Sequence, residues 1–209
     1  MILLLLITGC NFVGKQSDIR QLESVAGVDS LFVPTGNAKL DSLLQLAAVA
    51  PQDTVLAQLY YQIGDLYENS EPERAKEYYL KLNDLSEQLD WNEGRWQFAS
   101  AFAILLGREG LLDSALVVLA PALELAKKEN NEAWIAYLYI NTGAVYSGKE
   151  WYETALSYFM EAMPLIERTN DAKKLGGLYQ KIGGVYININ VFEKDVGNKR
   201  KRRANVFLP

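Results

Sequence analysis

Residues 139–146 read YINTGAVY, and residues 179–186, 40 positions later, read YQKIGGVY. Residues 60–67 form a third copy, YYQIGDLY, and residues 99–106 form a degenerate copy, ASAFAILL, at the same offset before the first. A second motif places a large residue four positions after an alanine and a small or apolar residue seven positions after it. It recurs at the same offset: Ala75, Tyr79 and Leu82; Ala115, Leu119 and Ala122; Ala155, Phe159 and Ala162. Self-similarity at one fixed period predicts an array of repeats.

The two motifs are typical of a pair of packed helices. Glycine and alanine are expected where two helices cross closely, and aromatic side chains fill the space between one helical hairpin and the next. Upstream, residues 40–48 repeat apolar positions at helical spacing, at Leu40, Leu43, Leu44, Ala47 and Ala48, until Pro51 closes that helix. The chain then keeps helical spacing nearly to its end. The sequence therefore predicts an all-α fold.

This order of residues resembles the tetratricopeptide repeat (TPR), in which an aromatic, a Leu-Gly pair, a tyrosine, and then alanine, phenylalanine and alanine recur across a helical hairpin. The resemblance covers the chain from Thr54 to Glu193. It implies a right-handed α-solenoid of helical hairpins. The period of about 40 residues exceeds the common period of about 34, which we interpret as longer helices with longer turns.

Local signals predict where individual helices begin. Residues 70–73, SEPE, match a capping box with proline in the first turn, so a helix is expected to start there. We expect either Asn130 or Asn131 to cap one later helix, and Asn170 to cap another.

The first ten residues, MILLLLITGC, end in the only cysteine of the chain. Ile7 to Cys10 resemble a bacterial lipobox, which implies a signal peptide over 1–9, cleavage before Cys10, and a stable lipid anchor on its thiol. Residues 10–37 then form a flexible tether. The alternative is a buried apolar strand with an ordinary cysteine. The leader has no Lys or Arg, which is explained if the true start lies a few codons upstream.

The C-terminal residues depart from the repeat. The next motif alanine is due at position 195, where Asp195 stands instead. We therefore expect a solenoid over 38–193, with about 3.5 repeats plus an N-terminal helix, and an irregular basic tail over 194–209. Two hypotheses remain: the reading frame was lost near Phe192, which we favour, or the tail is a genuine basic extension.

Composition excludes several kinds of chemistry. The chain has no histidine and one cysteine, so it offers no histidine base, no Cys/His zinc set and no disulfide framework. Its carboxylate pairs fall at predicted turns, whereas general acid work needs an enclosing pocket. We predict that it is not an enzyme and has no cofactor or metal. The net charge of −5 includes the basic tail, so the remaining body is more acidic still, which argues against a nucleic-acid partner.

The resemblance implies that the first helix of each hairpin lines the concave face and binds a protein or peptide. The candidate partner-binding residues are Gln58, Tyr61, Gln62, Asp65, Gln97, Ser100, Ile104, Arg108, Tyr137, Asn141, Ala144, Gln180, Lys181 and Gly184. The alternative for each is a merely solvated helix face. The basic and amide residues that clamp a peptide carboxylate in some TPR proteins are absent, and Asp65 would repel that group.

Three functions are weighed on these grounds. The lipobox, tether and repeats together resemble the repeat-bearing sensory regions of Bacteroidetes signalling proteins, which implies an envelope lipoprotein, on the periplasmic side, that binds a protein or peptide as a sensory input. A second candidate is a self-associating scaffold, because Tyr179, Ile182 and Tyr186 lack a partner helix. A third is a glycan or small-ligand module using Trp91, Trp96, Trp134 and Trp151, although hairpin packing explains these residues more simply.

Overall fold

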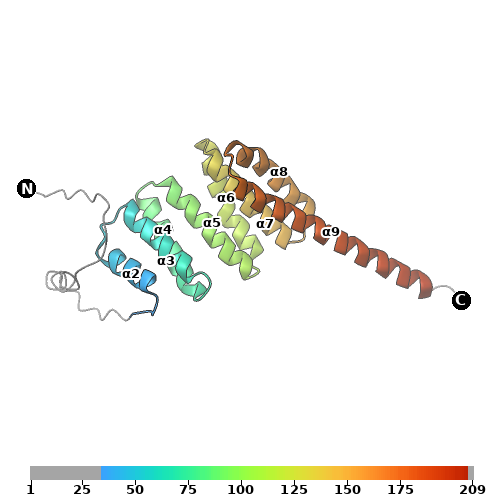
Figure 1. Ribbon diagram of the computed structural model, residues 1–209, viewed down its shortest axis with the longest axis horizontal. Coiled ribbons are helices and arrows are strands. Elements are labelled where there is room, and N and C mark those ends of the chain that lie inside the picture. Colours follow the sequence, from blue (N-terminus) through green and yellow to red (C-terminus); the bar gives the residue numbers. More distant parts are fainter. Residues whose placement is uncertain (1–33, 207–209) are drawn as a thin grey trace, which may run out of the picture. The chain divides into compact units, whose positions relative to one another are not determined.

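The computed structural model describes the backbone of residues 34–206 and the side chains of residues 34–190. Its elements, all of which are helices in the described residues, are α2 (Ala38–Val49), α3 (Thr54–Tyr67), α4 (Pro72–Gln88), α5 (Asn92–Arg108), α6 (Leu112–Lys128), α7 (Glu132–Gly148), α8 (Tyr152–Arg168) and α9 (Ala172–Val206) (Figure 1). They lie in one compact unit, Asn37–Pro209. The expected all-α solenoid is confirmed. The expected signal peptide, the lipid site at Cys10 and most of the tether lie outside the described residues.

The helices alternate between two layers. We call α3, α5, α7 and α9 the A-helices, and α4, α6 and α8 the B-helices. Each of α3, α5 and α7 forms a hairpin with the B-helix after it, and each B-helix also packs on the next A-helix. Consecutive A-helices contact each other, whereas the three B-helices do not contact one another. The A-helices therefore form the closer-packed side of the stack, as expected for the concave layer of a solenoid.

The repeat period consists of two nearly identical halves. Helices α4 to α8 each have 17 residues, and a short connection of the same length separates each from the next. The middle residue of each connection has positive φ, at Asp90, Gly110, Asn130, Glu150 and Asn170. Long helices were expected, but the expected longer turns are wrong, because a single left-handed residue is enough to end each helix.

Four of these five connections, those after α4, α5, α6 and α7, are Schellman motifs. In one of them the N–H of Asn130 donates to the carbonyl of Lys127, and the N–H of Asn131 to that of Ala126, both at 3.0 Å. The same pattern recurs after α4, α5 and α7. Each motif satisfies carbonyl groups that a helix end otherwise leaves unpaired, so the regular turn fixes the length of every helix.

Glu150 is the one left-handed turn residue in the described chain that is neither Gly, Asn nor Asp, with φ of 61°. Because its Cβ is strained in this conformation, Glu150→Gly is expected to raise the free energy of unfolding by about 0.5 to 1 kcal/mol. Gly110→Ala, the matched change in the opposite direction, is expected to lower it by about 1 kcal/mol. Urea unfolding of both variants checks the pair, and a loss of stability in Glu150→Gly would contradict the assigned turn.

Two glycines of the first motif lie where the structure has no room for a side chain. A Cβ on Gly64 would lie 2.5 Å from Cε1 of Tyr79, and a Cβ on Gly143 would lie 2.6 Å from Cε1 of Phe159. Both rings belong to the following B-helix and are fully buried. The expected close crossing of two helices at the motif glycine is therefore confirmed in the first and third hairpins.

The predicted helix starts can now be compared with the structure. Helix α4 starts at Pro72 as predicted, but its N-cap is Glu71 and the capping box does not form, because no side chain caps this helix. Asn131 caps α7, accepting from the N–H of Trp134 at 3.2 Å. The expected cap at Asn170 is wrong, because Asn170 takes the left-handed turn position. The cap of α9 is Asp171, whose pKa is lowered by the backbone N–H of Lys174.

The irregular tail expected from Lys194 is wrong as far as Val206, because α9 runs without interruption from Ala172 to Val206. Residues 191–206 lack an amphipathic repeat, but a helix needs none. They contain no proline and one glycine, and they are rich in Lys and Arg, which are good helix formers. The described chain therefore continues its last A-helix where a B-helix was due.

Candidate partner-binding surface

The predicted binding residues lie on neighbouring A-helices. Helix α5 packs between α3 and α7, and α7 also contacts α9. Gln58 to Asp65 lie on α3, Gln97 to Arg108 on α5, Tyr137 to Ala144 on α7, and Gln180 to Gly184 on α9. We call the side chains of this set the A-helix surface. The structure thus places them on one continuous layer of neighbouring helices.

Several members of the A-helix surface bind one another across repeats. Gln97 Nε2 donates to Gln58 Oε1 at 3.2 Å, between α5 and α3. Asn141 Nδ2 donates to Ser100 Oγ at 2.6 Å, between α7 and α5. These four side chains therefore hold adjacent repeats in register, and part of their hydrogen-bonding capacity is already used.

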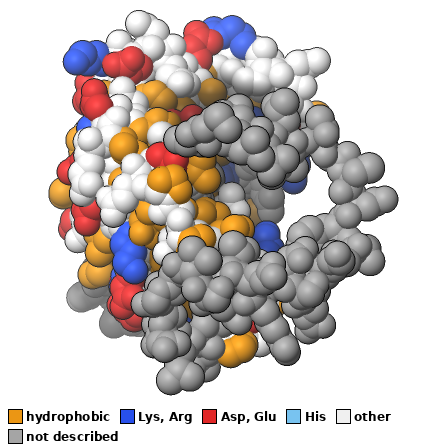
Figure 2. Space-filling view, turned by 90° about the vertical axis from the view of Figure 1, so that its left-hand side faces the viewer, with side chains coloured by type: hydrophobic (Ala, Val, Ile, Leu, Met, Phe, Trp, Pro, Cys, Tyr) orange, Lys and Arg blue, Asp and Glu red, His pale blue; other side chains and the backbone are white. Residues whose placement is uncertain are grey.

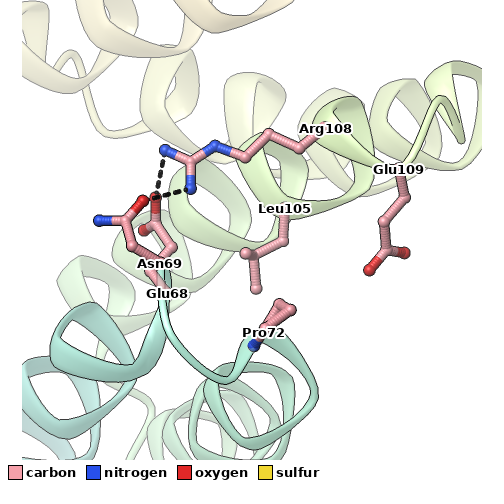
Figure 3. A pocket seen from close by; sticks show the side chains of 6 residues that line it. All are labelled: Glu68, Asn69, Pro72, Leu105, Arg108 and Glu109. Atoms are coloured by element: carbon pink, nitrogen blue, oxygen red, sulfur yellow. Dashed lines mark hydrogen bonds and ion pairs between the residues drawn. The ribbon is translucent and has the colours of Figure 1, made fainter.

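Arg108 crosses from the end of α5 to the turn between α3 and α4 (Figure 3). Its Nη2 lies 2.8 Å from Glu68 Oε1, and its Nη1 donates to Asn69 Oδ1 at 3.1 Å. With Pro72, Leu105 and Glu109, these residues line a hollow of about 310 Å³. The hollow is small, and the Glu68 carboxylate that lines it is already paired with Arg108.

Glu68 has a structural role that the sequence did not indicate. Its side chain is only 13% exposed, and its Oε2 accepts a hydrogen bond from the Tyr79 hydroxyl at 3.1 Å. Burial, and next the Glu68 carboxylate, raise the pKa of Tyr79, so this phenol stays protonated and donates at neutral pH. Glu68 is therefore engaged by two fixed groups, which does not suit a general acid.

Tyr61, also on α3, packs its ring against Tyr79, with ring centroids 6.2 Å apart. Burial raises the pKa of Tyr61, and the carboxylates of Asp65 and Glu68 raise it further. Tyr61 therefore contributes to the packing between α3 and α4. Gln62 and Asp65, by contrast, are exposed.

The exposed aromatic position of α7 is Tyr137, which is 40% exposed. Its ring contacts Trp134 at 5.7 Å between centroids, and the Lys174 ammonium lies 5.5 Å from its centroid. Ile104 of α5 is 40% exposed as well. The groups of the A-helix surface that remain accessible are exposed side chains of Gln62, Asp65, Ile104, Arg108, Tyr137, Gln180 and Lys181.

The tryptophans do not form a ligand platform. Trp96 is buried and packs against Trp134, with ring centroids 5.9 Å apart. Trp91 is half-buried beside Gly94, and only Trp151 is exposed, at 55%. The chain's described residues contain no group of Asp, Glu or Cys that suits a metal ion, and none of the described helices is both long and apolar enough to cross a membrane.

The helical hairpins form a stack, and the motif glycine of an A-helix packs against an aromatic ring of the following B-helix. This arrangement defines a TPR-like α-solenoid. No family model matches the sequence, and no curated protein matches it. Solved structures of similar fold include the following two. One is a signal transduction ATPase with numerous domains (STAND) protein with a tetratricopeptide repeat sensor, from Pyrococcus horikoshii, with a TM-score of 0.60 and 18% identity. The other is BtubC (BKLC) from P. vanneervenii, with a TM-score of 0.60 and 19% identity.

The extent of these matches differs. The STAND match covers 76% of this chain but 25% of that protein, so this chain spans about a quarter of its length. The BtubC match covers 92% of this chain and 77% of that one. At these identities the likeness shows the fold alone, which is a TPR-like repeat array.

Proposed function

We propose that this chain is a non-catalytic lipoprotein of the bacterial cell envelope whose solenoid binds a protein or peptide segment. The observation that carries the binding proposal is the A-helix surface. There, exposed Tyr137, Ile104 and Arg108 stand among amides that are already fixed by cross-repeat hydrogen bonds. Aromatic and arginine side chains are frequent binding anchors, and a rigid surface loses less entropy when a partner docks.

The proposal extends to signalling. The similar protein from Pyrococcus horikoshii is described as a STAND protein with a tetratricopeptide repeat sensor. By analogy, and with the sequence resemblance to sensory regions of Bacteroidetes proteins, we place this chain as the input part of a signalling system. Binding on the A-helix surface would be the input, and the output would lie in another protein or another segment.

The binding proposal is tested by substitution on the two sides of the stack. Tyr137→Ala is expected to weaken capture of the partner isolated from envelope extract by about tenfold or more, because a half-exposed aromatic anchor is lost. Val117→Ala removes a side chain that is 72% exposed on a B-helix and is expected to leave capture unchanged. Equal loss in both variants, or in neither, would contradict binding on the A-helix surface.

The anchor is tested separately, by the mass of the N-terminal peptide from membrane-fractionated cells. Lipid addition at Cys10 after cleavage predicts a lipid-modified peptide that begins at Cys10 in the membrane fraction. An unmodified peptide that still begins at Met1, recovered from the soluble fraction, would overturn the lipoprotein part of the proposal. The binding proposal would survive that result.

A further inference from the structure

The last described A-helix lacks the B-helix that the other A-helices have. Gly183 of α9 occupies the same repeat position as Gly143 of α7, where the Phe159 ring packs on the glycine. A Cβ on Gly183 would meet nothing within 4 Å. Tyr179 and Tyr186, which flank it on the same motif, are 51% and 54% exposed. We call Tyr179, Ile182, Gly183 and Tyr186 the α9 face; Ile182 is partly buried against the core below, and the other three are exposed in the described residues.

The first described helix, α2, also has an exposed apolar face. Helix α2 precedes α3 as a B-helix precedes an A-helix, and it packs on α3 through the buried Leu40 and Leu43. Its other side carries Ser42, Leu46 and Val49, of which Leu46 is 54% and Val49 is 74% exposed. Figure 2 views the side of the molecule where α2 lies and shows hydrophobic side chains gathered on the described surface.

The spacing of these three residues matches the B-helix motif. A small residue at 42, a large one four positions later and an apolar one seven positions later repeat the pattern of Ala155, Phe159 and Ala162. In α8 that pattern faces the motif glycine of α7. The Ser42 hydroxyl already donates to the carbonyl of Ala38 at 2.9 Å, so it needs no other partner on close approach. We call Ser42, Leu46 and Val49 the α2 motif.

We propose that the α2 motif of one copy of this chain docks on the α9 face of a second copy. The contact would cover in trans two helix faces that are exposed in the described residues, and it would bury Leu46 and Val49 against Tyr179 and Tyr186, beside the partly buried Ile182. The two surfaces are different, so the interface is heterologous. A complex of two copies keeps one free α9 face and one free α2 motif, so further copies can add head to tail, which gives a ring or an open filament rather than a twofold dimer.

Charge favours this arrangement over pairing of two α9 faces. Residues 172–190 carry Lys173, Lys174 and Lys181 and no acidic residue, whereas residues 38–65 carry three aspartates and one lysine. A twofold α9 pairing would bring like charges together, which costs free energy. Helix α2 carries one aspartate and one lysine, so docking of α2 on α9 avoids that repulsion.

The test uses the full chain with Cys10→Ser, which prevents lipid addition, in sedimentation velocity runs from about 1 to about 100 µM. The mean mass is expected to rise with concentration. Gly183→Leu fills the α9 face where no atom lies within 4 Å, and Val49→Lys places a charge on the exposed α2 motif. Each single variant is expected to stay monomeric, with self-association weakened about tenfold or more. Val117→Lys, at an exposed B-helix position, is the control and is expected to associate like the parent.

Mixing the two blocked variants distinguishes the geometry. Gly183→Leu keeps its α2 motif and Val49→Lys keeps its α9 face, so their mixture is expected to form one-to-one complexes and nothing longer. A parent chain that stays monomeric throughout would overturn the proposal. So would Val49→Lys remaining dimeric with no complex in the mixture, which would indicate twofold pairing through α9.

Discussion

Phe159→Ala is expected to lower the free energy of unfolding by about 3 to 5 kcal/mol, as large-to-small changes of buried aromatic residues do. The ring is 1% exposed and lies in a core with Ala136, Ala162, Ile166 and Leu178. It also contacts the motif glycine of α7. Because that core joins α7, α8 and α9, removing the ring leaves a cavity where the last A-helix is held.

Denaturant unfolding measures this loss, with Met160→Ala as the matched control. Met160 is the next residue of α8 but is 56% exposed, so its truncation is expected to change stability by no more than about 0.5 kcal/mol. Similar effects of the two substitutions would contradict the assignment of which face of α8 is buried.

Gly143→Leu and Gly183→Leu are expected to have opposite effects although they stand at the same repeat position. At Gly143 a new side chain meets the Phe159 ring, and its Cβ would also lie 3.1 Å from the backbone carbonyl of Ala155. Overpacking of this kind costs about 1 to 3 kcal/mol, and we expect the upper end because backbone cannot move aside easily. At Gly183 the space is open, so the better helix propensity of leucine is expected to add about 0.5 to 1 kcal/mol.

The pair is measured by urea unfolding in dilute solution, where the α9 face of each molecule is free. Gly64→Leu serves as a second crowded site, since Tyr79 lies against it as Phe159 lies against Gly143. If Gly183→Leu were as damaging as Gly143→Leu, the last A-helix would already have a partner that covers it.

The motif at 139–146 and its copies were enough to predict the fold, because glycine and aromatic residues at fixed spacing report the closest contact between helices. The division of each period into two equal halves was also present in the sequence, in the evenly spaced turn residues Asp90, Gly110, Asn130, Glu150 and Asn170. Only one of these is glycine, so the signal was weak.

The candidate site was less predictable. The repeat predicts which residues lie on the A-helices. The hydrogen bonds of Asn141 to Ser100 and of Gln97 to Gln58, however, depend on how each helix is rotated about its axis relative to its neighbour. Sequence spacing does not fix that rotation. The α2 motif was hard to predict for another reason: the buried stripe through Leu40 and Leu43 is sufficient to explain the helix, so the residues of the second stripe are indistinguishable from solvent-facing positions in the sequence.

The most direct test of the binding account is site-specific photocrosslinking in cells that make the full chain. A photoreactive residue would replace Gln62 or Tyr137 on the A-helix surface, or Val117 or Met160 on the exposed side of the B-helices. The account predicts one discrete protein adduct from the two A-helix positions and none from the two B-helix positions. The same adduct from the B-helix positions, with none from Gln62 or Tyr137, would contradict it.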